Sequence, residues 1–240
     1  MAAHPGLAAL LAAAVSAARL ALASDVATAA EPVSIVLITE AGCPGCMRAI
    51  TGELSAVVKE VGDIIDMQHH PFGNNYFATK ECGMDETYNS DVRHCWARTC
   101  VGVPNPPADC FSGSIVTQHG PDEAAVNRMT ACAIAHSASW RKYWPFLVCM
   151  EEAYPMLHVD ATRNCSGQAR LDYDALSACY SGAEGGELLV AHAKATADHM
   201  FTPTILVNGE SVDADGVLQA VCAAYKGPSP PVCQKMTVLT

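Results

Sequence analysis

The sequence predicts an α/β fold, and three features of the chain lead to this expectation. Near the start, a β-branched run is followed by a closely spaced pair of cysteines and then by apolar residues at helical spacing. Near the end, a strand pattern, a hairpin signal and a helix pattern follow one another. Between them lies a long stretch of helical patterns and cysteines. One open sheet that takes strands from both ends, with helices inserted between its halves, accounts for all three features.

The first half of this sheet is expected to begin with a buried strand at residues 34–39, where Ile, Val and Leu prevail. Residues 43–46 read Cys-Pro-Gly-Cys. Apolar residues at helical spacing then cover residues 47–60, and residues 63–68 resemble a second strand. A CxxC between a strand and a helix is the arrangement of a thioredoxin-like redox motif.

The second half of the sheet is expected to begin with a strand at residues 203–207. Asn-Gly at 208–209 is the strongest short hairpin signal, and residues 210–212 can return as the partner strand. Asp213 can then cap a helix that ends at the Lys-Gly-Pro of residues 226–228. The order strand, strand, helix completes a thioredoxin-like plan.

We expect the middle of the chain, about residues 77–199, to be an insertion between the two halves of the sheet. Residues 82–113 hold four cysteines and three prolines but little periodicity, which indicates a loop-rich segment held by disulfides. Helices are expected beyond it, at 123–137, 141–153, 173–180 and 187–198. The predicted fold is therefore thioredoxin-like with a long helical, disulfide-rich insertion, in a domain over 31–233 with a tail at 234–240.

Residues 1–23 form an alanine- and leucine-rich run that ends in small residues, as a cleaved secretory signal does. The alternative is a membrane-anchoring helix, which the sequence favours less because Arg19 interrupts the apolar stretch. Behind a signal, twelve cysteines indicate a disulfide framework and an oxidising or lumenal compartment. We therefore expect a protein of the secretory pathway, lysosomal or secreted, without a stable membrane span and glycosylated at the Asn164 sequon.

Composition and spacing also argue against several partners. Acidic residues outnumber basic ones by 25 to 14, which disfavours nucleic acid because phosphate binding needs a basic surface. A zinc site needs two more ligands at metal spacing beside a CxxC, and the sequence has no second CxxC. No metal and no bound cofactor are therefore expected; a redox-active dithiol needs only an external thiol, such as a small thiol reductant.

The chemistry is expected to reside in Cys43 and Cys46. When a CxxC starts a helix, the first sulfur faces unpaired backbone N–H groups and the positive end of the helix, and both stabilise its thiolate. Cys43 is therefore predicted to be the nucleophile that attacks a substrate disulfide. Cys46, one turn later, is predicted to resolve the mixed disulfide. The alternative for the pair is a structural disulfide.

Two further pairs of residues complete the predicted site and scaffold. In thioredoxin-like folds a cis-proline before the late strand faces the CxxC and lines the substrate groove. We therefore expect a cis Thr202–Pro203 bond close to Cys43 and a substrate-binding role for both residues. Cys222 and Cys233 flank a Gly- and Pro-rich stretch in which the chain must turn, so a disulfide between them is predicted. The alternative is a free Cys222, and the pairing of the other cysteines stays open.

Several short motifs, taken in order, resemble the gamma-interferon-inducible lysosomal thiol reductase family. That resemblance implies a thioredoxin-like domain with a helical insertion, reduction of protein disulfides at acidic pH, and N-glycosylation. The residues that carry it are Cys43-Pro44-Gly45-Cys46, Pro71-Phe72-Gly73-Asn74, Gln118-His119-Gly120, Asn127, Cys132, Val148-Cys149-Met150-Glu151-Glu152, Val207-Asn208-Gly209, Val221-Cys222, Tyr225-Lys226-Gly227 and Val232-Cys233.

The chain departs from the family pattern at two places. The family signature has a cysteine before Gln-His-Gly and a Glu-Cys pair after it. Here Thr117 stands at the first position and Ala124 follows Glu123, so both cysteines are missing together. The four cysteines of residues 82–110 are additional to the pattern. We expect this to change the local scaffold and to leave the chemistry of the dithiol intact.

The predicted function is a thiol–disulfide oxidoreductase that reduces disulfide-containing proteins. One alternative is an oxidase or isomerase of the same fold, because direction depends on the reduction potential. A second is a non-catalytic, disulfide-rich secreted binding protein. His119 is expected to be structural rather than a catalytic base, since a thiolate at a helix start needs no base. The neighbouring His69 and His70 are interpreted as the end of a strand.

Overall fold

The computed structural model describes residues 30–153, 161–196 and 198–237. The expected signal at residues 1–23 lies outside them, as does the end of the expected tail. In the described ranges, no helix combines the length and the apolar character that crossing a membrane requires.

The central sheet takes its strands from both ends of the chain. β1 (Val33–Thr39) pairs in parallel with β2 (Ile65–Pro71) and antiparallel with β5 (Thr204–Val207), and β6 (Glu210–Ser211) completes the order β2-β1-β5-β6. β1 lies inside the sheet, which explains the apolar run of residues 35–38. The strands from the two halves of the chain therefore meet at β1 and β5, with the insertion between them in sequence, as predicted.

The helix that follows the CxxC begins earlier than the sequence pattern indicates. α1 (Pro44–Ala49) runs directly into a π-helical turn (Ile50–Leu54) and then into α2 (Ser55–Val61) and a 3₁₀ turn (Gly62–Ile64). Pro44 occupies the first turn, where its missing N–H costs nothing. In the π turn, the Ser55 hydroxyl donates to the Ile50 carbonyl at 2.7 Å. Such widened turns often accompany functional sites.

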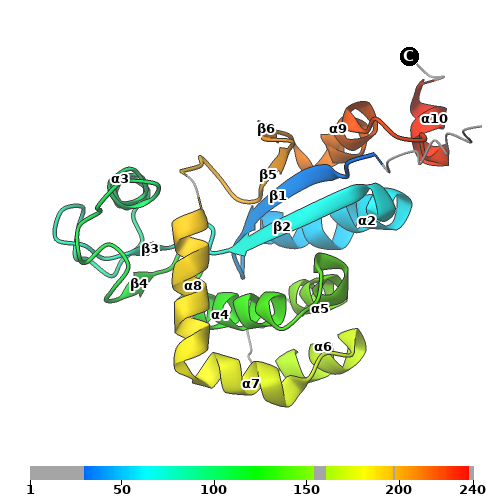
Figure 1. Ribbon diagram of the computed structural model, residues 1–240. Coiled ribbons are helices and arrows are strands. Elements are labelled where there is room, and N and C mark those ends of the chain that lie inside the picture. The colour runs from blue at the N-terminus through cyan, green and yellow to red at the C-terminus, as the bar shows by residue number, and fades with distance from the viewer. Residues whose placement is uncertain (1–29, 154–160, 197, 238–240) are drawn as a thin grey trace, which may run out of the picture.

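The insertion is largely helical, as expected, and its helices after residue 120 lie on one side of the sheet (Figure 1). Disulfides join Cys132 to Cys179 and Cys149 to Cys165, which fixes neighbouring helices of this layer to one another. Among the helices that follow residue 120, α6 was not predicted, because its sequence carries few apolar residues. The helices are α4 (Pro121–Ala135), α5 (Trp140–Glu152), α6 (Ala161–Ala169), α7 (Tyr173–Ser181) and α8 (Ala183–Ala195).

The segment expected to be loop-rich contains an eleven-residue helix, α3 (Ser90–Cys100), and this expectation is corrected. Asn89 caps the helix by accepting from the N–H groups of Asp91 and Val92. Its buried face includes Arg93 beside Trp96, so no apolar stripe marks it in the sequence. Disulfides Cys82–Cys95 and Cys100–Cys110 hold it.

A small second core forms around α3. β3 (Tyr76–Phe77) and β4 (Ile115–Val116) make a two-stranded antiparallel sheet, which was not predicted. Trp96 stacks at a tilt against Phe72 and Phe77, and its indole donates to the Cys110 carbonyl at 2.8 Å. Figure 1 shows this unit at one end of the molecule, opposite the C-terminal helices.

The C-terminal part contains the predicted hairpin and the predicted disulfide between Cys222 and Cys233. Asn208 and Gly209 have φ values of 49° and 88°, as a type I′ turn requires. A 3₁₀ turn (Ala214–Gly216) and α9 (Val217–Ala224) follow, and Asp213 makes no side-chain cap. Cys222 is joined to Cys233, with Cα atoms 5.3 Å apart. α10 (Pro231–Thr237) carries Cys233 and continues into the segment expected to be a tail.

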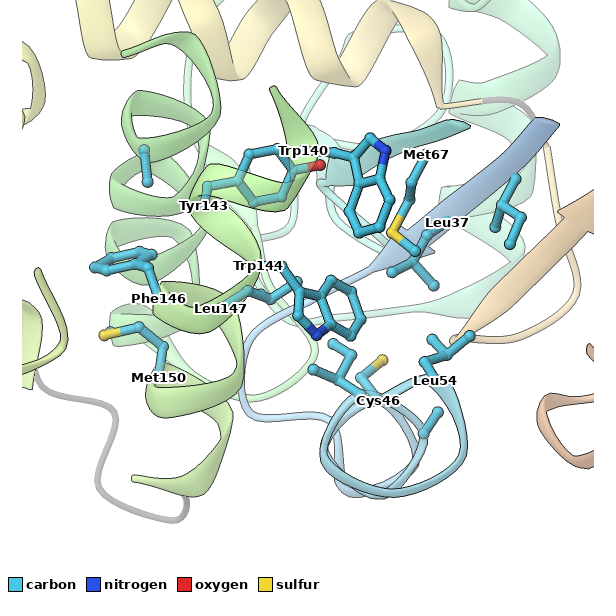
Figure 2. Packing of buried hydrophobic residues seen from close by; sticks show 14 of the residues in the cluster. Leu37, Cys46, Leu54, Met67, Trp140, Tyr143, Trp144, Phe146, Leu147 and Met150 are labelled. Carbon is cyan, nitrogen blue, oxygen red and sulfur yellow. The ribbon is translucent and has the colours of Figure 1, made fainter. Parts of the chain in front are cut away.

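The main core lies between the sheet and α5 and extends to the CxxC. One face of α5 presents Trp140, Tyr143, Trp144 and Leu147 toward Leu37 and Met67 of the sheet (Figure 2). Cys46 and Leu54 close the same cluster from the helix after the CxxC. The second cysteine of the motif is therefore part of the hydrophobic core.

Candidate active site

Cys43 and Cys46 occupy the start of the helix in the way the motif predicts. Cys43 is the N-cap of α1, and its Sγ accepts the Cys46 N–H at 3.2 Å. Gly42, with φ at 82°, allows the tight turn from β1 into this position. Both thiols are free. Cys43 keeps 6% of its surface exposed and Cys46 none, so an incoming disulfide can reach only Cys43.

The surroundings shift the pKa values of the two thiols in opposite directions. A hydrogen bond from the Cys46 side chain lowers the pKa of Cys43 to about 6, against the opposing effect of burial. Thr202 and the Cys46 N–H lower it further. Burial raises the pKa of Cys46 well above its ordinary value, and the neighbouring Cys43 adds to this. The two cysteines therefore have opposite pKa shifts: Cys43 ionises more readily than an ordinary thiol, and Cys46 ionises less readily.

The predicted substrate-binding residues lie beside Cys43. The Thr202–Pro203 bond is cis, as expected. The Thr202 carbonyl and hydroxyl oxygens lie 3.7 Å and 3.5 Å from Cys43 Sγ. Gly45 faces this loop, since a Cβ there would lie 3.3 Å from Pro203 Cδ. The glycine inside the CxxC thus lets the proline approach the dithiol.

Glu40, which the sequence analysis did not single out, lies at the centre of the site. It is fully buried, yet it accepts from the Thr202 hydroxyl at 2.9 Å and from the Asn74 N–H at 2.5 Å. Gly73, with φ at 54°, brings this backbone close enough, because a Cβ there would clash with Glu40. The sequence signal was the Pro-Phe-Gly-Asn motif of residues 71–74, to which no role was assigned.

His119 also lies in the site, although a structural role was expected for it. Its Nε2 is 3.2 Å from Glu40 Oε1, and this contact raises the pKa of the imidazole. Glu123 accepts from the His119 N–H at 2.6 Å, and burial raises the pKa of Glu123 to about 8. The hydroxyl of Thr117, where the family has a cysteine, donates to the Gly120 carbonyl at 2.7 Å and closes this turn.

A groove of about 450 Å³ gives access to these groups, and Glu40, Cys43 and His119 line it together with Asn74 and Thr202. The potential ligand atoms of Glu40, Cys43 and His119 lie within 4.8 Å of one another, so this trio is the place in the site where a metal ion could be held. The absence of a metal from the working enzyme stays a prediction.

A further buried acid approaches the dithiol from α5. Glu151 is buried, and burial together with the nearby Cys43 raises its pKa to about 8. Asn127, on α4, accepts the Ala41 N–H at 2.8 Å and so fixes the loop that leads into the CxxC. The helical insertion therefore contributes directly to the surroundings of the nucleophile.

Other residues singled out in the sequence lie elsewhere. Asn164 is exposed on α6, and the hydroxyl of Ser166 in the same sequon is buried and donates to the Thr162 carbonyl. His69 and His70 both belong to β2. His69 bonds to the Thr39 hydroxyl at 2.7 Å, so it supports the end of β1.

A thioredoxin-like sheet, a free dithiol at a helix start and a facing cis-proline define the class of this protein: it is a thiol–disulfide oxidoreductase. A model of the gamma interferon inducible lysosomal thiol reductase family matches residues 34–102 and 103–169. The chain belongs to this family.

Named relatives agree with this assignment. The gamma-interferon-inducible lysosomal thiol reductase of Carassius auratus is 26% identical over 216 residues, which cover 85% of this chain and 73% of the relative. The gamma-interferon-responsive lysosomal thiol protein of Arabidopsis thaliana is 24% identical, with 84% and 75% covered. Among solved structures, a putative protein disulfide isomerase from Nitrosomonas europaea aligns with a TM-score of 0.48 and 11% identity, over 80% of this chain and 97% of that one.

Proposed function

We propose that this enzyme reduces disulfides in proteins through Cys43 and Cys46, in an acidic compartment of the secretory pathway or lysosome. The observation that carries the proposal is the contrast within the pair. Cys43, with its pKa lowered to about 6, faces the groove, whereas the buried Cys46 has a raised pKa. A nucleophile and a resolving thiol need these two opposite properties.

The reaction takes two exchange steps. The Cys43 thiolate attacks one sulfur of the substrate disulfide; a bond forms between that sulfur and Cys43 Sγ, and the second substrate sulfur leaves as a thiolate and takes up a proton. Cys46 then gives up its proton and attacks Cys43 Sγ, which releases the first substrate cysteine as a thiol. The substrate gains two electrons and two protons, and the enzyme is left with a Cys43–Cys46 disulfide. An external thiol, oxidised in turn, restores the dithiol.

The lowered pKa of Cys43 suits an acidic compartment. Near pH 5, a thiol with a pKa of about 6 is about one-tenth ionised, whereas an unperturbed thiol is ionised to roughly one part in ten thousand. The five disulfides fit passage through an oxidising lumen. Asn164 is exposed and is the proposed glycosylation site.

Reduction of insulin by the purified enzyme and a small thiol, at about pH 5 and about pH 7, tests the proposal. We expect reduction at both values and none by the Cys43→Ser variant. Reactivation of scrambled ribonuclease, with no reduction of insulin, would favour the isomerase alternative instead. Insulin reduction at the wild-type rate by Cys43→Ser would contradict the assignment of the nucleophile.

A further inference from the structure

Two large apolar side chains stand exposed beside the nucleophile. Among the described residues, the large hydrophobic side chains with the greatest exposure are Met84 at 62%, Val103 at 38%, Met200 at 81% and Phe201 at 56%. Isolated exposed apolar residues are normal on a protein surface. Met200 and Phe201 differ from the other two because they are neighbours and directly precede Thr202, whose oxygens contact Cys43 Sγ. We call these two residues the docking ridge.

The docking ridge borders the path of a substrate to Cys43. Both residues line the groove of about 450 Å³ that contains Cys43. Phe201 also lines a second groove, of about 230 Å³, together with Gly45 and Pro203. A polypeptide whose cysteine reaches Cys43 through these grooves therefore comes close to Phe201, and to Met200 in the larger one.

The backbone before the ridge is held by a buried arginine from α3. Arg93 Nη1 donates to Asp198 Oδ1 at 2.6 Å and to the His199 carbonyl at 2.5 Å, and its Nη2 is 2.6 Å from His199 Nδ1. His94 adds a contact of 2.8 Å to Asp198.

The backbone after the ridge is held as well. The Thr204 hydroxyl donates to the Phe201 carbonyl at 2.6 Å, and the Thr202 hydroxyl donates to Glu40. The two apolar side chains are thus presented on a backbone that is fixed on both sides, which reduces the entropy lost when a ligand binds.

We propose that the docking ridge binds a bulky apolar side chain that flanks the cysteine of a disulfide-bonded polypeptide. This inference rests on the proposed function, since the occupant must deliver its disulfide to Cys43. Arg93 and His94 of α3 hold the segment that leads into the ridge.

Two disulfide peptides that differ only in the residue beside the cysteine, Leu or Ser, test this inference. We expect the wild-type enzyme to reduce the Leu peptide with a kcat/KM about tenfold higher, mainly through a lower KM. In the variant Met200→Ser/Phe201→Ser the ratio should fall to about one. The ratio serves as its own control, because a poorly folded variant lowers both rates and keeps their quotient. Met84→Ser, which removes an exposed methionine outside the groove, should keep the tenfold preference.

Three results would overturn the inference: no preference in the wild type, an unchanged preference in the double variant, or a dimer in solution that the double variant dissociates. The last result would show that a second copy of the chain covers the ridge. Failure of the proposed function looks different, since the wild type would then reduce neither peptide.

Discussion

Cys43 and Cys149 are covered to nearly the same extent, with 6% and 8% of their surfaces exposed, yet one is a free thiol and the other is locked in a disulfide. Cys149 lies near the end of α5 and is bonded to Cys165 of α6. Cys43 lies at the start of a helix, with its sulfur accepting a backbone N–H. Exposure therefore does not distinguish the reactive cysteine from the structural ones. The local backbone and the hydrogen-bond partners do.

The same division holds across the whole chain. Ten of the twelve cysteines form disulfides that join separate elements, and two remain as a dithiol inside one turn of helix. The ten limit the freedom of the scaffold, and the two are the proposed site of the chemistry. A variant can change the dithiol and its surroundings without changing a disulfide, or remove a disulfide without changing the dithiol.

The largest effect is expected from removing the resolving thiol. The Cys46→Ser variant should keep an attacking Cys43 but lose the release step, so that mixed disulfides with substrate accumulate and turnover falls by at least about a hundredfold. Non-reducing electrophoresis and mass spectrometry of the trapped species measure this. A mixed disulfide trapped on any cysteine other than Cys43 would contradict the division between one reactive dithiol and ten structural cysteines.

The converse change removes a structural pair. The variant Cys222→Ser/Cys233→Ser should lose about 3 kcal/mol of stability in the chain-entropy model, which lowers Tm by on the order of 6–10 °C. Calorimetry measures the loss. The specific activity well below the transition should stay at the wild-type level, and a lost activity in the still-folded variant would show that this pair takes part in the reaction.

A smaller effect is expected from the partner of the nucleophile. In Thr202→Val, Cys43 loses a hydroxyl that lies 3.5 Å from its sulfur and lowers its pKa. The pH midpoint for alkylation should move upward, and the rate near pH 5 should fall by about threefold to tenfold. Thr202→Ser keeps the hydroxyl and serves as the matched control. If the pH profiles of alkylation were identical for both variants, the Thr202 hydroxyl would not contribute to the lowered pKa of Cys43.

The smallest effect concerns Glu151. The pKa of Glu151 is raised to about 8 in the folded state. Its contribution to stability is therefore complete at a pH below the pKa of this group in the unfolded chain, and it is lost as the pH rises toward 8. Cys43, with a lowered pKa, acts in the opposite direction, and it is present in both wild type and variant. Between about pH 6.5 and pH 8, the Tm of Glu151→Gln should therefore fall by about 2–4 °C less than that of wild type.

The neighbouring Glu152, which is exposed, gives the control for this measurement. The Tm of Glu152→Gln should depend on pH as the Tm of the wild type does. If the Tm of all three proteins changed equally with pH, Glu151 would not have the raised pKa on which this prediction rests.

Local signals made the reactive pair and its sheet predictable. The strand before Cys43, the hairpin at Asn208 and the C-terminal disulfide each depend on residues close together in sequence. The contact between Glu40 and His119 joins residues 79 positions apart, and the contact between Glu40 and Thr202 spans 162, so no local pattern announces them.

The unpredicted helix α3 has a similar cause. α3 buries the charged Arg93 where an amphipathic pattern would have an apolar residue, because the partners Asp198 and His199 come from the far side of the insertion. Its N-cap residue, Asn89, was the one local signal available. Hydrogen bonds between polar side chains of distant segments depend on tertiary packing, and the periodicity of the sequence does not indicate them.

The reactivity of Cys43 as a function of pH tests the central claim most directly. The reduced protein is alkylated with limiting iodoacetamide between about pH 4 and pH 9, and the label on each cysteine is quantified by peptide mass spectrometry. We expect label on Cys43 with a midpoint at about pH 6, and label on Cys46 only at much higher pH. A midpoint for Cys43 at the value of an ordinary thiol, or earlier labelling of Cys46, would contradict the claim that the helix start and its hydrogen bonds make Cys43 the nucleophile.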